Sequence, residues 1–110
     1  MIKVLLSLDL IESEDQRDDF YEHLKEQNWL KTKDVDTVWT IKFPNANPDN
    51  EEHYKSIRDK IARVLIDAAT ALKLKKIYYV AQLGNHEVIS REISKIDGTY
   101  KCTFRNLYPQ

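Results

Sequence analysis

Asp9 and Ser7 are the residues of this sequence whose type and spacing best suit chemistry. They lie two positions apart in residues 2–10, where hydrophobic and polar side chains alternate. Alternation with period two is typical of a half-buried β-strand, so both side chains should share the face opposite the hydrophobic one. A carboxylate there can bind a divalent metal such as Mg²⁺, because hard cations prefer oxygen ligands. Ser7 could then orient a phosphate group or a water molecule.

These residues also have simpler interpretations. Asp9 could accept hydrogen bonds from backbone N–H groups where the strand leaves the sheet, and Ser7 could be a solvated strand residue. A second candidate pair is His86 and Glu87, which follow a glycine–asparagine turn signal at residues 84–85 and could act as general acid and base. Polar residues at the tip of a turn would look the same. The sequence alone leaves these alternatives open.

Several classes of site are excluded. The single cysteine, Cys102, cannot form an internal disulfide or a zinc site built from paired cysteines, so we expect it to be a small core residue. The three histidines show no close metal-ligand spacing. The chain also lacks a glycine-rich phosphate loop, a G-x-S-x-G elbow and an H-E-x-x-H pair.

Two amphipathic helices should position the strand that carries Asp9. The first is predicted over residues 13–28, with Ser13 as N-cap and Gln16 completing a capping box. The second begins after Asp49 or Asn50, either of which could cap it. Its hydrophobic residues recur every three or four positions and predict a buried stripe: Tyr54, Ile57, Ile61, Val64, Leu65, Ala68 and Leu72.

Further strands are predicted over residues 37–43 and 76–83, with a short one over residues 29–33. Residues 88–96 fit either a strand or a short helix. Asp97-Gly98 is a hairpin signal that would pair this segment with residues 100–107. Aromatic side chains on these strands could stack nucleobases on an open sheet face or pack in the core: Trp39, Tyr78, Tyr79, Tyr100 and Phe104.

The order strand, helix, short strand, strand, helix, strand predicts an α+β fold, a ferredoxin-like βαββαβ sandwich with two helices on one face of an antiparallel sheet. A C-terminal hairpin or strand should extend the sheet. We expect one domain over residues 1–110, with a core of residues 1–83 and an extension of residues 84–110. The face with Ser7 and Asp9 then needs a second copy or a ligand to cover it.

The net charge of −1, from 17 basic and 18 acidic side chains, argues against strong nonspecific binding of nucleic acid. The charge is uneven, because residues 12–26 hold seven acids and two bases whereas residues 55–76 hold seven bases and two acids. These are either solvated helix faces or a bipolar surface for an acidic partner. Residues 2–10 are too short for a signal peptide or a membrane span, so we expect a cytoplasmic protein without a membrane partner.

The chain resembles the superfamily of small ferredoxin-like endoribonucleases, which includes the CRISPR-associated adaptation nucleases, the VapD toxins and the GhoS antitoxin. The resemblance covers roughly residues 1–83 and rests on three segments: Ser7-Leu8-Asp9-Leu10, Trp29-Leu30-Lys31-Thr32 and Val38-Trp39-Thr40. It implies that Asp9 lies at a homodimer interface with a metal-binding or catalytic role. It also implies that the tail, residues 100–108, adds to the sheet of the partner. The chain differs in its long loop over residues 44–50 and in having few arginines near Asp9.

Two functions follow. The first is a homodimeric, metal-dependent endoribonuclease or a related RNA- or DNA-processing protein, in which Asp9 of each subunit holds one Mg²⁺ and Ser7 assists. The alternative is a non-catalytic protein-interaction module, such as an antitoxin, an anti-defence inhibitor or a regulatory subunit. The near-neutral charge, the bipolar helices and the absence of a second obvious catalytic group favour this alternative. The sequence does not decide between them.

Overall fold

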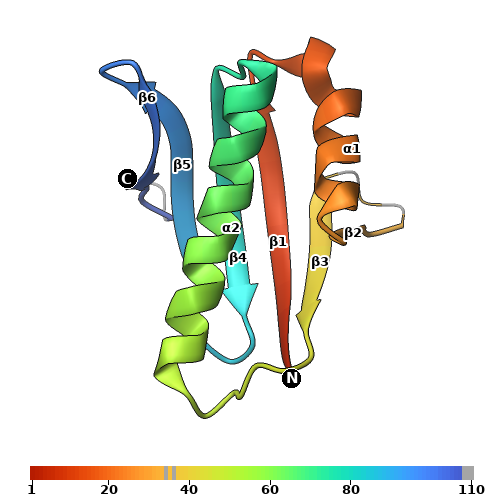
Figure 1. The fold of residues 1–110 in the computed structure, drawn as a ribbon, viewed down its shortest axis with the longest axis vertical. Helices are drawn as coiled ribbons and strands as arrows, with labels where there is room; N and C mark the ends of the chain where they lie inside the picture. Colours follow the sequence, from red (N-terminus) through yellow and green to blue (C-terminus); the bar gives the residue numbers. More distant parts are fainter. Residues whose placement is uncertain (34, 36, 108–110) are drawn as a thin grey trace.

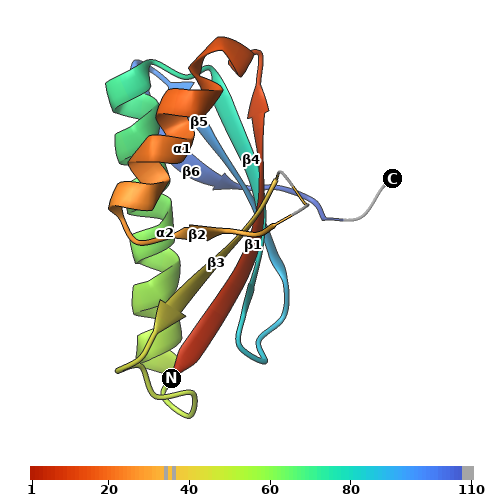
Figure 2. The same ribbon diagram turned by 90° about the vertical axis from the view of Figure 1, so that its right-hand side faces the viewer.

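The computed structural model describes residues 1–33, 35 and 37–107. Six strands form one sheet, and two α-helices lie along one side of it (Figures 1 and 2). The strands are β1 (Ile2–Ile11), β2 (Leu30–Lys31), β3 (Val38–Phe43), β4 (Lys76–Leu83), β5 (Ile89–Ile96) and β6 (Thr99–Phe104). The helices are α1 (Arg17–Glu26), which follows a 3₁₀ turn, η1 (Glu14–Gln16), and α2 (Glu51–Leu72).

The strand order across the sheet is β2-β3-β1-β4-β5-β6, and every neighbouring pair is antiparallel. β1 therefore lies inside the sheet, between β3 and β4. The connection through α1 passes over β3 to reach β2, and the connection through α2 passes over β1 to reach β4. The prediction of an α+β fold with an antiparallel sheet and two helices on one face is confirmed at this level.

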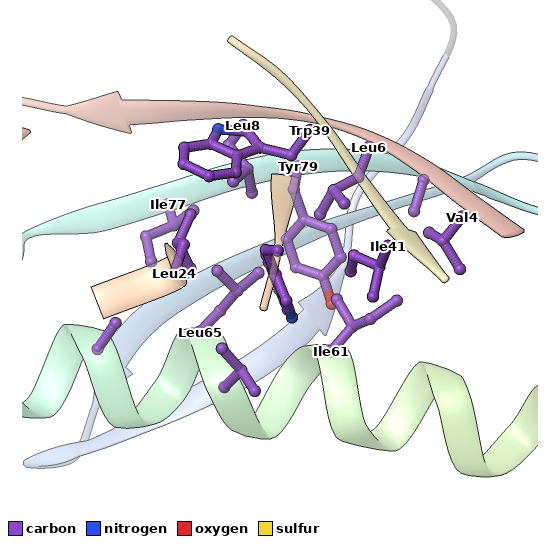
Figure 3. Close-up of a cluster of buried hydrophobic side chains, with 14 of the residues drawn as sticks. Val4, Leu6, Leu8, Leu24, Trp39, Ile41, Ile61, Leu65, Ile77 and Tyr79 are labelled. Carbon is purple, nitrogen blue, oxygen red and sulfur yellow. The ribbon is translucent and has the colours of Figure 1, made fainter. Parts of the chain in front are cut away.

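The core lies between the sheet and the helices (Figure 3). Alternate hydrophobic residues of the strands pack there against the hydrophobic stripes of the helices. On β1, Leu6 and Leu8 are 1% and 4% exposed, and they pack in one cluster with Ile61 and Leu65 of α2. Trp39 of β3 is fully buried in the same cluster. Each such side chain contributes roughly 1.5–3 kcal/mol through removal of apolar area from water. This packing fixes which face of β1 is left for other contacts.

The two helix starts differ from each other. Asn50 is the N-cap of α2, because its Oδ1 accepts a hydrogen bond of 2.9 Å from the Glu52 N–H. The capping box predicted for Ser13 is wrong. The Ser13 hydroxyl is buried, donates to the Ile11 carbonyl at 3.2 Å and accepts from the Lys75 N–H at 3.0 Å. It therefore joins the end of β1 to the segment that enters β4. No helix among the described residues is long and apolar enough to cross a bilayer.

The C-terminal segment is a β-hairpin. Residues 89–96 form a strand rather than a helix, and β5 pairs with β6 across a turn at Asp97 and Gly98, both with positive φ. The predicted hairpin is confirmed, although β6 ends at Phe104 and Tyr108 lies outside the described residues. Residues 84–88 connect β4 to β5, which is longer than the two-residue turn that the sequence predicts.

Candidate functional site

The second face of the sheet carries no helix, and we call it the open face (Figure 2). Strand register places alternate residues of every strand on it. From β1, β2 and β3 these are Lys3, Leu5, Ser7, Asp9, Ile11, Leu30, Val38, Thr40 and Lys42. From β4, β5 and β6 they are Lys76, Tyr78, Val80, Gln82, Ser90, Glu92, Ser94, Ile96, Thr99, Lys101 and Thr103.

Asp9 lies on the open face near the end of β1, and its side chain is exposed. No hydrogen bond or ion pair joins it to another residue that the structure describes. Its two carboxylate oxygens can therefore accept hydrogen bonds or bind a metal. The arrangement offers no support, within the described residues, for Asp9 as an acceptor of backbone hydrogen bonds.

Ser7 shares the open face with Asp9, one pleat away along β1. Its hydroxyl donates to the Thr37 hydroxyl at 3.3 Å. Residues two apart on one strand are separated by about 7 Å. Ser7 therefore lies beside Asp9 on the open face and does not contact its carboxylate. The structure thus brings the two predicted site residues to one surface but leaves them unconnected.

Sequence reasoning missed two residues beside Asp9. The β-sheet register places Asp9, Tyr78 and Glu92 in one row across β1, β4 and β5. The guanidinium carbon of Arg105 lies 3.7 Å from the centre of the Tyr78 ring. Glu92 accepts a hydrogen bond of 2.9 Å from Ser94. Glu92 lies in residues 88–96, which the sequence assigned to either a strand or a short helix, and Arg105 reaches Tyr78 from beyond the end of β6, so no local pattern could place them here.

The row does not form a metal site within one copy. The described residues contain no group of three or more histidine, cysteine, aspartate or glutamate side chains that could hold a metal ion. Asp9 and Glu92 are separated by β4, and two strand spacings amount to about 9.5 Å. One copy of the chain therefore offers Asp9 as a single carboxylate, and further ligands must come from outside it.

His86 lies away from the open face and against α2. Its ring stacks on Tyr54 with centres 3.5 Å apart, and its Nε2 is 3.4 Å from the carboxylate of Glu51. Gly84 passes close by, since a Cβ there would approach the Tyr54 hydroxyl to 3.1 Å. The geometry ties residues 84–88 to the start of α2. The acidic partner of His86 is thus Glu51, and within the described chain no hydrogen bond or ion pair joins His86 to Glu87.

Most strand aromatics face the helices. Trp39 and Tyr79 are buried, and the Tyr79 hydroxyl lies 3.4 Å from the Cys102 sulfur. Burial, followed by the contact with Cys102, raises the pKa of Tyr79. The Tyr100 hydroxyl donates to the Leu74 carbonyl at 2.6 Å. Tyr78 is therefore the member of the predicted stacking set that reaches the open face.

The outer surfaces of the helices carry the uneven charge noted in the sequence. On α1 and its entrance the exposed acids include Asp15, Asp18, Asp19 and Glu22. On α2 the basic residues share a hollow of about 610 Å³ with acidic ones, so this surface is mixed rather than basic: its lining includes Lys55, Asp59, Lys60, Arg63 and Asp67.

Comparisons with known proteins do not add to this description. No protein-family model matches the sequence, and searches of curated proteins and of solved structures give no significant match.

Proposed function

We propose that the chain is an RNA-processing nuclease with a ferredoxin-like fold, which works as a homodimer with Asp9 as its metal ligand. The strand order β2-β3-β1-β4, with both helices on one side, supports the ferredoxin-like assignment. The observation that carries the proposal is the position of Asp9. It is an exposed carboxylate on an inner strand of an uncovered sheet face, with no partner among the described residues.

The charge of the open face supports a nucleic-acid substrate. The chain as a whole has a net charge of −1, but this face collects more cations than anions. Its acidic side chains are Asp9 and Glu92, and its cationic ones are Lys3, Lys42, Lys76, Lys101 and the adjoining Arg105. Phosphate groups are attracted to such a surface even when the bulk charge of the protein is not basic.

The lysines are not gathered at one point. Lys3 and Lys42 are direct cross-strand partners at one end of the open face, and Lys76 lies on the strand end next to Ile11 at the other. Like charges placed directly opposite each other destabilise a sheet, so the Lys3–Lys42 pair suits an anionic ligand. Basic ends on either side of Asp9 would hold a phosphodiester chain across it.

A second copy supplies the missing metal ligand. Mg²⁺ is commonly held by one or two carboxylates together with waters and substrate phosphates. Sheets that pack face to face lie about 10 Å apart. Two aspartate oxygens, each ~3 Å from its own Cα, and two metal–oxygen bonds of ~2 Å span the same distance. The residues therefore fit one Mg²⁺ between two copies of Asp9.

The contact between copies is proposed on the β2-β3-β1 side of the open face. Leu5 and Leu30 are 51% and 55% exposed there, and Thr40 is the cross-strand partner of both. Large exposed leucines on one sheet face, here on either side of Thr40 of β3, are suited to burial against a second copy. Leu5→Glu should convert a dimer to a monomer in light scattering after gel filtration, whereas Val88→Glu, at an exposed position in the β4–β5 connection, should not.

When bound, the metal would acidify a water molecule and polarise the scissile phosphate. The chain itself holds the metal through Asp9, and the lysines at the two ends of the face bind the flanking phosphates. Ser7, whose hydroxyl is held by Thr37 at 3.3 Å, would present its remaining hydrogen-bonding capacity to a phosphate oxygen or a water.

The test is cleavage of end-labelled RNA by highly purified protein with Mg²⁺ or Mn²⁺, and with EDTA. We expect cleavage with metal and none with EDTA, and Asp9→Asn should lower the rate by about 100-fold or more, exceeding the usual loss for an outer-shell change. The matched control is Asp97→Asn at the tip of the β5–β6 hairpin, where asparagine tolerates the positive φ. If wild-type protein cleaves no RNA with either metal, or Asp9→Asn cleaves equally well, the nuclease proposal fails.

A second candidate function, a non-catalytic interaction module, is favoured by the exposed acids of α1. Asp15, Asp18, Asp19 and Glu22 lie on the outside of the helix layer, and all are exposed. Such a module would form a complex with a basic protein partner that can be rebuilt from purified components. Replacing Asp18 and Asp19 by lysine should abolish that complex. For a non-catalytic module, neither the wild-type protein nor this variant should cleave RNA. A complex that survives this charge reversal would rule out α1 as the docking surface.

A further inference from the structure

Tyr78 is placed to contact a substrate at Asp9. It is the direct cross-strand partner of Asp9 on β4, and its ring lies on the open face. The other aromatic side chains of the described strands have the opposite pleat and face the helix layer or its margin. An aromatic ring on an uncovered sheet is a surface on which a nucleobase can stack, because every base has an aromatic face.

The guanidinium of Arg105 lies over the Tyr78 ring. Arg105 follows the end of β6, and its backbone N–H donates to the Ser90 carbonyl at 3.2 Å, which brings the segment back over β5. Its guanidinium carbon lies 3.7 Å from the centre of the Tyr78 ring, at stacking distance. The guanidinium forms no ion pair with a carboxylate among the described residues. A planar cation on an aromatic ring is a common element of nucleobase recognition.

Space for a base adjoins this pair. A hollow of about 660 Å³ opens beside Arg105, and its lining includes Gln82 and Ser90 of the open face together with Asn106. Ligand pockets commonly enclose about 300–1,000 Å³. The pair itself is held loosely, since an exposed cation–π contact is worth only about 0.5–1 kcal/mol. A base can therefore separate the guanidinium from the ring at small cost.

We infer that Tyr78 and Arg105 form a subsite for one unpaired nucleobase, with the base stacked on the Tyr78 ring and covered by the Arg105 guanidinium. The inference rests on the proposed function for placing the scissile phosphate at Asp9, and it names the substrate class as single-stranded RNA. A paired base cannot enter, because its faces are already stacked in the duplex. The hollow beside Arg105 lies on the β4-β5-β6 side of β1, whereas Leu30 of the proposed dimer contact lies on the β2 side.

The chain contains a matched control on the other face of the hairpin. Lys95 and Tyr100 are cross-strand partners of β5 and β6, and the Lys95 ammonium nitrogen lies 5.8 Å from the centre of the Tyr100 ring. Neither of them is among the described residues that line the hollow beside Arg105. This pair repeats a cation–aromatic contact away from the open face and from the carboxylate of Asp9. Substitutions there report any general effect of disturbing the hairpin.

The experiment measures binding without cleavage. Fluorescence anisotropy of a labelled ten-nucleotide RNA is recorded with the full chain in EDTA at one fixed salt concentration, for the single strand and for its duplex. Tyr78→Leu should weaken single-strand binding about 5- to 100-fold, the usual range for loss of one stacked base. Tyr78→Phe should retain it within about twofold because the ring is kept. Arg105→Ala should weaken it about 2- to 30-fold.

Lys95→Ala and Tyr100→Leu should leave binding unchanged, and the duplex should bind more weakly than the single strand. The subsite is refuted if Tyr78→Leu binds like wild type, if Tyr100→Leu weakens binding equally, or if the single strand does not bind. Thermal unfolding of each variant checks that the fold is intact. Cleavage by wild type with no effect of Tyr78→Leu would overturn the subsite alone. Loss of binding in Tyr78→Leu without any metal-dependent cleavage would overturn the nuclease proposal alone.

Discussion

The two faces of the sheet differ in solvent exposure along β1, where successive side chains point to opposite faces. Leu6 and Leu8 are 1% and 4% exposed beneath the helices, whereas Leu5 is 51% exposed on the open face. The covered side is filled by aliphatic and aromatic side chains from every layer (Figure 3). The open side combines exposed leucines with lysines and with Asp9.

This difference indicates that the covered face provides stability and the open face is available for binding. Packing on the covered face removes apolar area from water and provides most of the free energy of folding. On the open face, Asp9 has no partner among the described residues and the lysines line up without compensating acids at the Lys3–Lys42 pair. Such groups add little to stability, so substitutions there should change binding while leaving the fold intact.

The largest predicted contrast is between Leu65 and Leu5. Leu65 of α2 is fully buried, so Leu65→Ala should lower the free energy of unfolding by about 3 kcal/mol through lost transfer energy and a cavity. Leu5→Ala should change it by less than about 0.5 kcal/mol in dilute solution, as for other surface positions. Urea unfolding measures both. Equal losses for the two variants at every protein concentration would show that Leu5 is covered within one copy.

Alkaline pH should act through the covered face. Burial, and then the contact with Cys102, raises the pKa of Tyr79, so the folded chain keeps this proton where the unfolded chain loses it. The associated stability is complete below about pH 10 and declines as the pH rises above that value. The decline from this one residue approaches ~1.4 kcal/mol per pH unit.

Urea unfolding between pH 8 and 11 measures this effect. Tyr79→Phe has no phenol proton to lose, so its free energy of unfolding should fall less steeply than that of wild type over the alkaline part of the range. Identical slopes for the two proteins would mean that Tyr79 ionises as readily in the folded chain as in the unfolded one.

Much of the covered face was predictable from sequence because burial on one side imposes a repeating pattern. The strand predicted over residues 76–83 is found as Lys76–Leu83, and all seven residues predicted for the buried stripe of α2 are buried or half-buried. The Asn50 cap and the Asp97-Gly98 turn are likewise local signals. Each depends on residues within a few positions of one another.

The open face was less predictable because its contacts join distant segments. Asp9 and Ser7 could be assigned to one face by alternation, but the row from Asp9 through Tyr78 to Glu92 exists only once three strands are in register. Ser13 fits a helix cap by its local sequence, yet Lys75 draws its hydroxyl into a contact across 62 positions. The ordering of strands decides such contacts, and no short motif encodes it.

Two residues in and just after β6 provide a smaller test, because Tyr100 contacts the helix side of the sheet and Arg105 contacts Tyr78 on the open face. The Tyr100 hydroxyl donates to the Leu74 carbonyl at 2.6 Å on the helix side. Tyr100→Phe should therefore cost about 1 kcal/mol, the usual net value of a hydrogen bond. It should leave RNA binding unchanged, whereas Arg105→Ala should weaken RNA binding and cost at most about 1 kcal/mol of stability. Urea unfolding and fluorescence anisotropy measured on the same samples check both effects. Weaker RNA binding by Tyr100→Phe, or unchanged RNA binding by Arg105→Ala, would contradict the prediction.

The smallest predicted effect lies at the end of α2, away from both faces of the sheet. Lys73 follows the helix with φ 56° and ψ 46°, a left-handed conformation that side chains with a Cβ disfavour. Lys73→Gly should relieve that strain, and because glycine also gains entropy in the unfolded chain the net increase in stability should be about 0.5 kcal/mol. Lys73→Ala keeps the Cβ and should bring no such gain, while RNA binding should be the same in both variants. A gain in Lys73→Ala equal to that in Lys73→Gly would trace the effect to the lost charge instead of the backbone.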